Sequence, residues 1–206
     1  TLSNILKFSN NQKVWADLIT HLSGSEKHKP VILYGPTGCG KSFGVEECLK
    51  LCNINCVILD GSCPESPAEL ETWIIQVRNN GVLEGKGGVL FIDDIESFTP
   101  QCREILVKQI NLTKRRMSTI IITCTDLYAL DIKSIASIVP KDRSFKLYPM
   151  NDNMITRILS KKGYNNRLIE NILPFGKGDV RQCEIVLKLY CATKGILEEK
   201  GIKSNI

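Results

Sequence analysis

The sequence predicts an α/β protein with a doubly wound, parallel five-stranded sheet and a small C-terminal helical lid. Short apolar runs alternate with helical segments as far as Tyr148, an order that is typical of parallel sheets. A glycine-rich turn links the first apolar run directly to a helix. From Asn151 onward the pattern changes, and only helical segments follow.

The composition is that of a globular protein. The chain has 206 residues, of which 43% are hydrophobic, and this is enough to build a core. No apolar run approaches the roughly 20 residues of a membrane span, so we expect no membrane association. We expect an α/β core over residues 1–149 and a helical lid over residues 150–206, with a hinge near Pro149.

The first elements are a helix and a strand. Helical periodicity runs over residues 14–22 and ends at the turn around Gly24. Residues 31–34 form a short apolar run, β-branched at its start, which predicts the first strand. A helix over residues 43–51 and a second strand over residues 55–60 follow.

The next helix, over residues 66–78, has a clear start signal. Ser66 is suited to the cap, Pro67 to the first turn, and Glu69 follows three residues after the cap. The remaining core elements alternate, with strands expected at 89–94, 118–124 and 144–148 and helices at 99–116 and 130–139. The lid helices are expected at 152–162, 167–173 and 179–194.

The turn after the first strand is a complete phosphate-binding loop. Its glycines let backbone N–H groups point into one concavity, and the helix N-terminus adds partial positive charge. Lys41 is expected to reach the β- and γ-phosphates of ATP or GTP, and the Ser42 hydroxyl to ligate Mg²⁺. The expected nucleotide-binding residues are Gly35, Pro36, Thr37, Gly38, Cys39, Gly40, Lys41, Ser42 and Phe43.

Carboxylates follow the apolar run that begins at Val89. Asp93 is expected to hold Mg²⁺ together with Ser42, and Asp94 to orient and polarise the attacking water. Glu96 is a competing candidate for the second role, although it lies beyond the expected strand end.

Polar residues also end the following strand. Groups at the carboxyl ends of parallel strands face the ligand crevice, so Thr125, or Thr123, is expected to contact the γ-phosphate or the attacking water. Asp126 is expected to cap the next helix. Arg181 is expected to reach the γ-phosphate, and Arg143 to act as an arginine finger on a neighbouring subunit, although a solvated side chain explains Arg143 equally well.

These motifs resemble those of the AAA+ ATPases. Residues 35–42 correspond to Walker A, 89–94 to Walker B, 123–126 to sensor 1 and 178–181 to sensor 2. Within that superfamily the chain is most similar to clamp-loader subunits of the replication factor C type, in particular the large-subunit and checkpoint types. The most specific match is the G-D-V-R-Q sequence at residues 178–182.

The resemblance implies ATP- and Mg²⁺-dependent loading of a ring-shaped sliding clamp onto primed DNA, with other AAA+ subunits as partners. It assigns the catalytic acid position to Asp94, sensor 1 to Thr125 and sensor 2 to Arg181, and it places the stretch around residues 6–11 near adenine. It also implies a role in DNA replication or repair and an intracellular location, in the nucleus or another site of DNA replication.

The chain departs from the family pattern at three positions. The acid after Asp93 is usually Glu, and Asp94 is one methylene shorter, so hydrolysis could be slow while binding stays intact. Thr125 stands where the sensor 1 asparagine is usual, and the Ser-Arg-Cys finger motif is absent around Arg143. Two alternatives therefore remain: a nucleotide-gated assembly subunit and, against the evidence of the lid, a small-molecule kinase.

Two further features concern charge and cysteine. Lys108, Lys114, Arg115 and Arg116 follow one helix, which predicts contacts to the DNA backbone without base readout. The nine cysteines include no C-x-x-C pair, so we expect no zinc site. Reduced thiols in a reducing intracellular compartment are the expected state.

Overall fold

The computed structural model describes residues 9–25, 29–61, 66–79, 88–113, 119–129 and 132–199. The chain divides into two compact units. The first consists of residues 1–36 and 40–148, and the second of residues 37–39 and 149–206.

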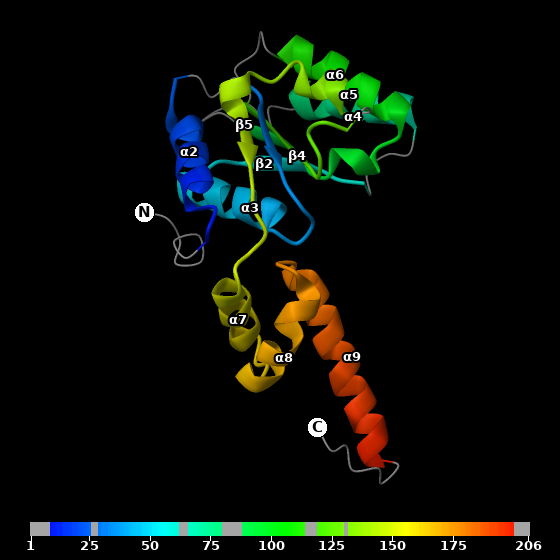
Figure 1. Ribbon diagram of the computed structural model, residues 1–206. Helices are drawn as coiled ribbons and strands as arrows, with labels where there is room; N and C mark the ends of the chain where they lie inside the picture. Colours follow the sequence, from blue (N-terminus) through cyan, green and yellow to red (C-terminus); the bar gives the residue numbers. More distant parts are fainter. Residues whose placement is uncertain are drawn as a thin grey trace. The chain divides into compact units, whose positions relative to one another are not determined.

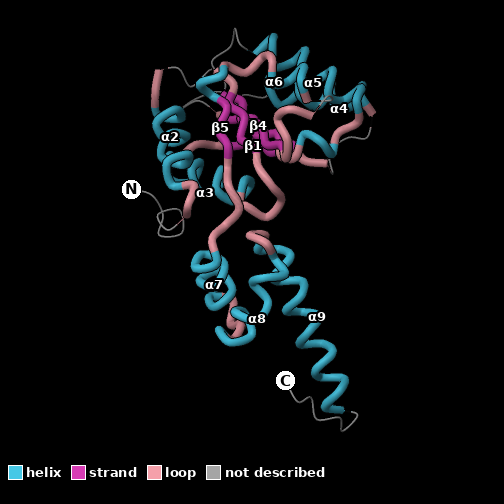
Figure 2. Tube along the Cα trace, viewed as in Figure 1, coloured by secondary structure: helices cyan, strands magenta, loops and turns pink. Residues whose placement is uncertain are grey.

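A five-stranded parallel sheet forms the centre of the first unit (Figures 1 and 2). The strands are β1 (Val31–Tyr34), β2 (Cys56–Leu59), β3 (Val89–Ile92), β4 (Thr119–Cys124) and β5 (Ser144–Lys146). They lie in the order β2-β3-β4-β1-β5. This arrangement confirms the predicted fold class, and it brings the carboxyl ends of β1, β3 and β4 to one edge of the sheet.

Helices cover both faces of this sheet (Figure 1). They are α2 (Gln12–Ser23), α3 (Lys41–Cys52), α4 (Pro67–Asn79), α5 (Pro100–Thr113) and α6 (Lys133–Ala136), with short 3₁₀ turns η1 (Ile95–Ser97) and η2 (Lys141–Arg143). As predicted, Ser66 caps α4, because its hydroxyl accepts a hydrogen bond from the Glu69 backbone N–H at 3.2 Å.

Alternating strand residues build the two faces. Ile32, Ile92 and Ile122 belong to one buried cluster with residues of α4 and α5, such as Leu70 and Leu106. The side chains between them point to the opposite face. On the opposite side α2 packs on α3 so closely that a methyl group at Gly44 would lie 2.3 Å from the Trp15 ring.

A buried asparagine holds the end of the first unit. Asn11 is 2% exposed, and its side chain pairs with the backbone of Tyr148 in the manner of a short strand. Its Nδ2 donates to Tyr148 O at 2.9 Å, and its Oδ1 accepts from Tyr148 N at 2.8 Å. The residues just before the predicted hinge are therefore fixed to the beginning of α2.

The second unit contains α7 (Asp152–Lys161), α8 (Asn166–Gly176) and α9 (Val180–Glu199). Polar caps begin these helices: Asn151 Oδ1 accepts from Met154 N at 2.8 Å, and Asn165 Oδ1 from Arg167 N at 2.9 Å. Their apolar faces form a small core of their own, comprising Ile155, Leu159, Ile169, Ile172, Cys183 and Leu187. None of the helices in the described ranges is long and apolar enough to cross a bilayer.

Two predicted elements differ in extent. The helix predicted over residues 130–139 is only the single turn Lys133–Ala136 in the described chain, because serine and β-branched residues dominate it and Pro140 restricts the residue before it. Conversely, α8 passes the predicted end at residue 173 and continues through Pro174 to Gly176. A proline removes one backbone hydrogen bond, but its φ angle is compatible with a helix.

Candidate nucleotide-binding site

The loop between β1 and α3 has a backbone that only glycine fits at two points. Gly35 N donates to Cys124 O at 3.2 Å, and a methyl group at Gly35 would lie 2.4 Å from Leu147 O. Gly40 caps α3 with a φ of 90°, in the left-handed region that favours glycine. The loop thus leads into the first turn of α3, where backbone N–H groups have no intrahelical partner and are suited to bind an anion.

Lys41, the first residue of α3, folds back onto its own loop. Its Nζ donates to Gly35 O at 2.6 Å and to Pro36 O at 3.0 Å. Phe43, two residues further along α3, is 43% exposed. Cys39 is buried at 2% exposure. The two hydrogen bonds of Lys41 thus hold its ammonium at the loop, on the neutral carbonyls of Gly35 and Pro36.

Asp93, immediately after β3, receives two hydrogen bonds on one oxygen. Asp93 Oδ1 accepts from Ser42 Oγ at 2.8 Å and from Thr123 Oγ1 at 2.6 Å. Hydroxyl and carboxylate oxygens are the ligands that Mg²⁺ prefers, so Ser42 and Asp93 fit the predicted metal site in chemistry and in proximity. Among the described residues no group of three or more His, Cys, Asp or Glu forms a further metal centre.

Thr123 connects Asp93 to Asp94. The Thr123 hydroxyl donates its single proton to Asp93 and accepts from the Asp94 backbone N–H at 2.8 Å. Thr123 is completely buried in β4. Sequence reasoning named it only as an alternative to Thr125, although a polar residue within the apolar run 120–124 was the available signal.

Asp94 lies at a sharp turn with its carboxylate exposed. Its φ of 55° and ψ of 65° place it in the left-handed region, which aspartate tolerates better than most residues. Asp94 is the N-cap residue of η1, which follows β3 after two residues. Asp94 therefore lies at the start of η1, whereas Asp93 directly follows β3.

Glu96, within η1, reaches the end of β4. Its Oε1 accepts from the backbone N–H of Thr125 and, at 3.2 Å, from that of Asp126. Burial raises the pKa of the Glu96 carboxyl, the two backbone N–H groups oppose this, and the neighbouring Asp94 carboxyl adds to the rise. The sequence predicts Glu96 only as a competing candidate, and the structure brings its carboxyl to the end of β4, where Thr123 also contacts Asp93.

The other predicted site residues of the first unit lie on different elements. The Thr125 side chain is exposed after β4, and Asp126 accepts from Tyr128 N at 2.9 Å, so it caps a turn rather than the predicted helix. Arg143 ends η2, with its Nε 3.4 Å from Asp142 Oδ2. Lys114, Arg115, Arg116 and residues 6–8 lie outside the described residues.

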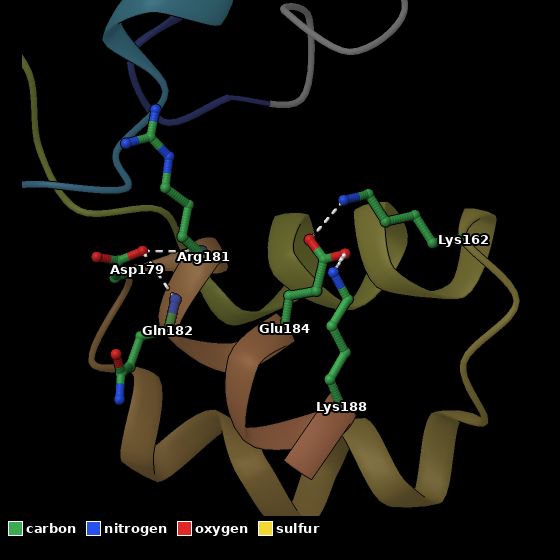
Figure 3. Close-up of polar contacts among 6 residues, drawn as sticks. All are labelled: Lys162, Asp179, Arg181, Gln182, Glu184 and Lys188. Atoms are coloured by element: carbon green, nitrogen blue, oxygen red, sulfur yellow. Dashed lines mark hydrogen bonds and ion pairs between the residues drawn. The ribbon is translucent and has the colours of Figure 1, made fainter. Parts of the chain in front are cut away.

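Arg181 belongs to the first turn of α9 in the second unit. Figure 3 shows Asp179 Oδ1 accepting from the backbone N–H groups of Arg181, at 2.8 Å, and of Gln182, at 3.2 Å. The Arg181 side chain extends away from the helix, whereas Glu184 pairs with Lys162 and Lys188 (Figure 3). Asp179 thus caps α9, which gives the aspartate of the G-D-V-R-Q sequence a local structural role.

The described cysteines are free thiols. Burial raises the pKa of Cys48 and of Cys124 to about 12 and that of Cys56 to about 11. These thiols are therefore uncharged at neutral pH and act as small apolar side chains.

The chain belongs to the family described as "ATPase family associated with various cellular activities (AAA)", which matches residues 31–140, more than half of its length. The family-level resemblance read from the motifs is thereby confirmed. The matched range begins at β1 and includes the loop, Asp93, Asp94 and Thr125.

The chain is also similar to two known proteins. It is 24% identical over 191 residues to the protein called "Replication factor C large subunit" of Methanococcus aeolicus, covering 88% of this chain and 39% of that protein. The crystal structure of Cdc6p from Pyrobaculum aerophilum has a TM-score of 0.66 at 17% identity, covering 95% of this chain and 64% of that one. The chain thus spans about two fifths of the curated relative's length, and the Cdc6p likeness concerns the fold.

Proposed function

We propose that this chain binds ATP with Mg²⁺ at the loop between β1 and α3 and hydrolyses it slowly. The observation that carries the proposal is the hydrogen bond of 2.8 Å between Ser42 Oγ and Asp93 Oδ1, which joins the loop to the end of β3. The first turn of a helix has backbone N–H groups without intrahelical partners, and at α3 these are suited to bind phosphate oxygens. Bound Mg²⁺ would neutralise the phosphate charge.

The proposed roles follow from what each side chain already contacts. Lys41 transfers its hydrogen bonds from the loop carbonyls to phosphate oxygens, and Asp93 with Ser42 supplies oxygen ligands for the metal. Asp94 is the residue proposed to orient the attacking water. The roles of Thr125, Arg181 and Arg143 at the γ-phosphate stay predictions from the resemblance.

Substitution of Lys41 tests the site directly. Lys41→Ala removes the ammonium that the loop carbonyls hold, and we expect ATP affinity to fall by about tenfold to a hundredfold, the range of a charge-assisted hydrogen bond. The measurement is titration with a fluorescent ATP analogue. Lys50→Ala, which removes an equal charge from the other end of the same helix, is the matched control and should leave affinity unchanged. Equal affinities for wild type and Lys41→Ala contradict the proposal.

A second candidate function is nucleotide-gated assembly without appreciable turnover. The observation that favours it is Asp94, a short acid on a left-handed turn where the family usually has Glu. Asp94→Glu lengthens the side chain by one methylene, so we expect kcat to rise about tenfold if reach limits hydrolysis. Fast wild-type turnover that Asp94→Glu leaves unchanged would remove the case for this candidate.

We further propose that the nucleotide site serves clamp-loader-like remodelling in DNA replication or repair, with AAA+ subunits, a sliding clamp and DNA as partners. The similarity to a protein named as a replication factor C large subunit supports this assignment. A site of DNA replication is the corresponding cellular location. Stimulation of ATP turnover by primed DNA and a clamp tests it.

A further inference from the structure

The ends of β3 and β4 are joined by side chains after their backbone pairing stops. The parallel register of the two strands ends with Ile92 beside Ile122. Beyond this pair the chains diverge, β3 into η1 and β4 into the turn that begins at Thr125. Hydrogen bonds between side chain and backbone continue the connection.

Two such connections run in opposite directions. From β3 to β4, the Asp94 backbone N–H donates to the Thr123 hydroxyl at 2.8 Å. From β4 to η1, the backbone N–H groups of Thr125 and Asp126 both donate to Glu96 Oε1. The donors are the backbone N–H groups of Asp94 and Thr125, two residues that are predicted to act on the nucleotide. Their positions therefore depend on the acceptors, Thr123 and Glu96.

We infer that Glu96 is a positioning residue for nucleotide hydrolysis, whose carboxyl fixes the Thr125–Asp126 turn against η1. The inference rests on the proposed ATPase function. One oxygen of Glu96 serves both N–H groups, whereas Oε2 is buried and has no hydrogen-bond partner among the described residues. The contact with the turn therefore requires only an acceptor at Oε1, and a carboxamide supplies one equally well.

Two variants of Glu96 distinguish a positioning role from a role as general base. Glu96→Ala removes the acceptor and should release the turn. Glu96→Gln keeps an acceptor oxygen and should preserve the turn, but an amide cannot take a proton from water. A positioning role therefore predicts rescue by Gln, and a base role predicts that Gln is as inactive as Ala.

Amide hydrogen exchange without nucleotide tests the contact itself. In Glu96→Ala the amides of Thr125 and Asp126 should exchange about tenfold faster or more, because their acceptor is gone. In Glu96→Gln they should exchange as in wild type. Unchanged exchange in Glu96→Ala overturns the inference, whether or not the chain turns over ATP.

Steady-state kinetics then tests the consequence. We expect Glu96→Ala to lower kcat by about tenfold with KM changed less than about twofold, and Glu96→Gln to retain most of kcat. Glu71→Ala is the matched control, because Glu71 Oε1 also accepts two hydrogen bonds at 3.2 Å, from Lys108 and Gln109, away from the site. Loss of kcat in Glu96→Gln equal to that in Glu96→Ala overturns the inference. Wild-type protein that binds no ATP would refute the proposed function while the exchange result still decides the contact.

Discussion

Thr123 shows how a single hydroxyl can organise two neighbouring acids. It donates to the Asp93 side chain and accepts from the Asp94 backbone, and both bonds are short. Because the residue is completely buried, neither partner can exchange this hydroxyl for bulk water at low cost. The geometry at Asp93 thus depends on a completely buried residue of the neighbouring strand β4.

Replacement of Thr123 by valine tests this dependence. Thr123→Val keeps the branched shape but removes the acceptor of the Asp94 backbone N–H and one of the two donors to Asp93 Oδ1, so the free energy of unfolding should fall by about 1–3 kcal/mol. The affinity for Mg²⁺-ATP should fall as well, since Asp93 loses one of the two donors that orient it. Denaturant unfolding and nucleotide titration measure the two effects.

Thr119→Val is the control for this experiment. Thr119 is buried at the other end of β4, so its replacement also perturbs a buried threonine. It should leave nucleotide affinity intact whatever it does to stability. If both variants weaken ATP binding equally, the specific role of Thr123 is wrong.

The contrast between Asp93 and Glu96 explains how much of this site could be predicted from the sequence. The loop residues and Asp93 depend on local order, a strand followed by glycines or by acids, and this order is visible in the sequence. The partners of Glu96 are backbone N–H groups 29 and 30 residues away. Backbone groups are present at every position, so nothing in the sequence marks these two until β3 and β4 pair.

At the scale of elements, the predicted strands and most helices agree with the structure because their signals are strong and local. The apolar run of β4 and the Ser66 cap of α4 are examples. The helix predicted at residues 130–139 was wrong in extent, since short-range turns compete well where serine and β-branched residues give the helix little support. Burial of Ile132 and Ile135 fixes this segment by packing rather than by helix propensity.

At the scale of the whole molecule, the proposed clamp-loader role predicts dependence on DNA and on salt. ATP turnover should increase when primed DNA and a sliding clamp are added, because the partners bind the nucleotide-loaded form. The increase should shrink as salt rises from about 50 to 200 mM, since contacts to phosphates release counterions. Turnover that is indifferent to DNA at every salt concentration would contradict the DNA-linked role and leave ATP binding untouched.

The hydrogen bonds of Lys41 and Ser42 have a consequence for how tightly a ligand can be held. Both groups are already satisfied within the protein, by Gly35 and Pro36 carbonyls and by Asp93. Nucleotide entry is therefore an exchange of partners, and only the difference between the old and new bonds contributes to affinity. Lys41→Ala and Ser42→Ala therefore report this difference in bond strength and not the full strength of the bonds that each side chain forms with the nucleotide.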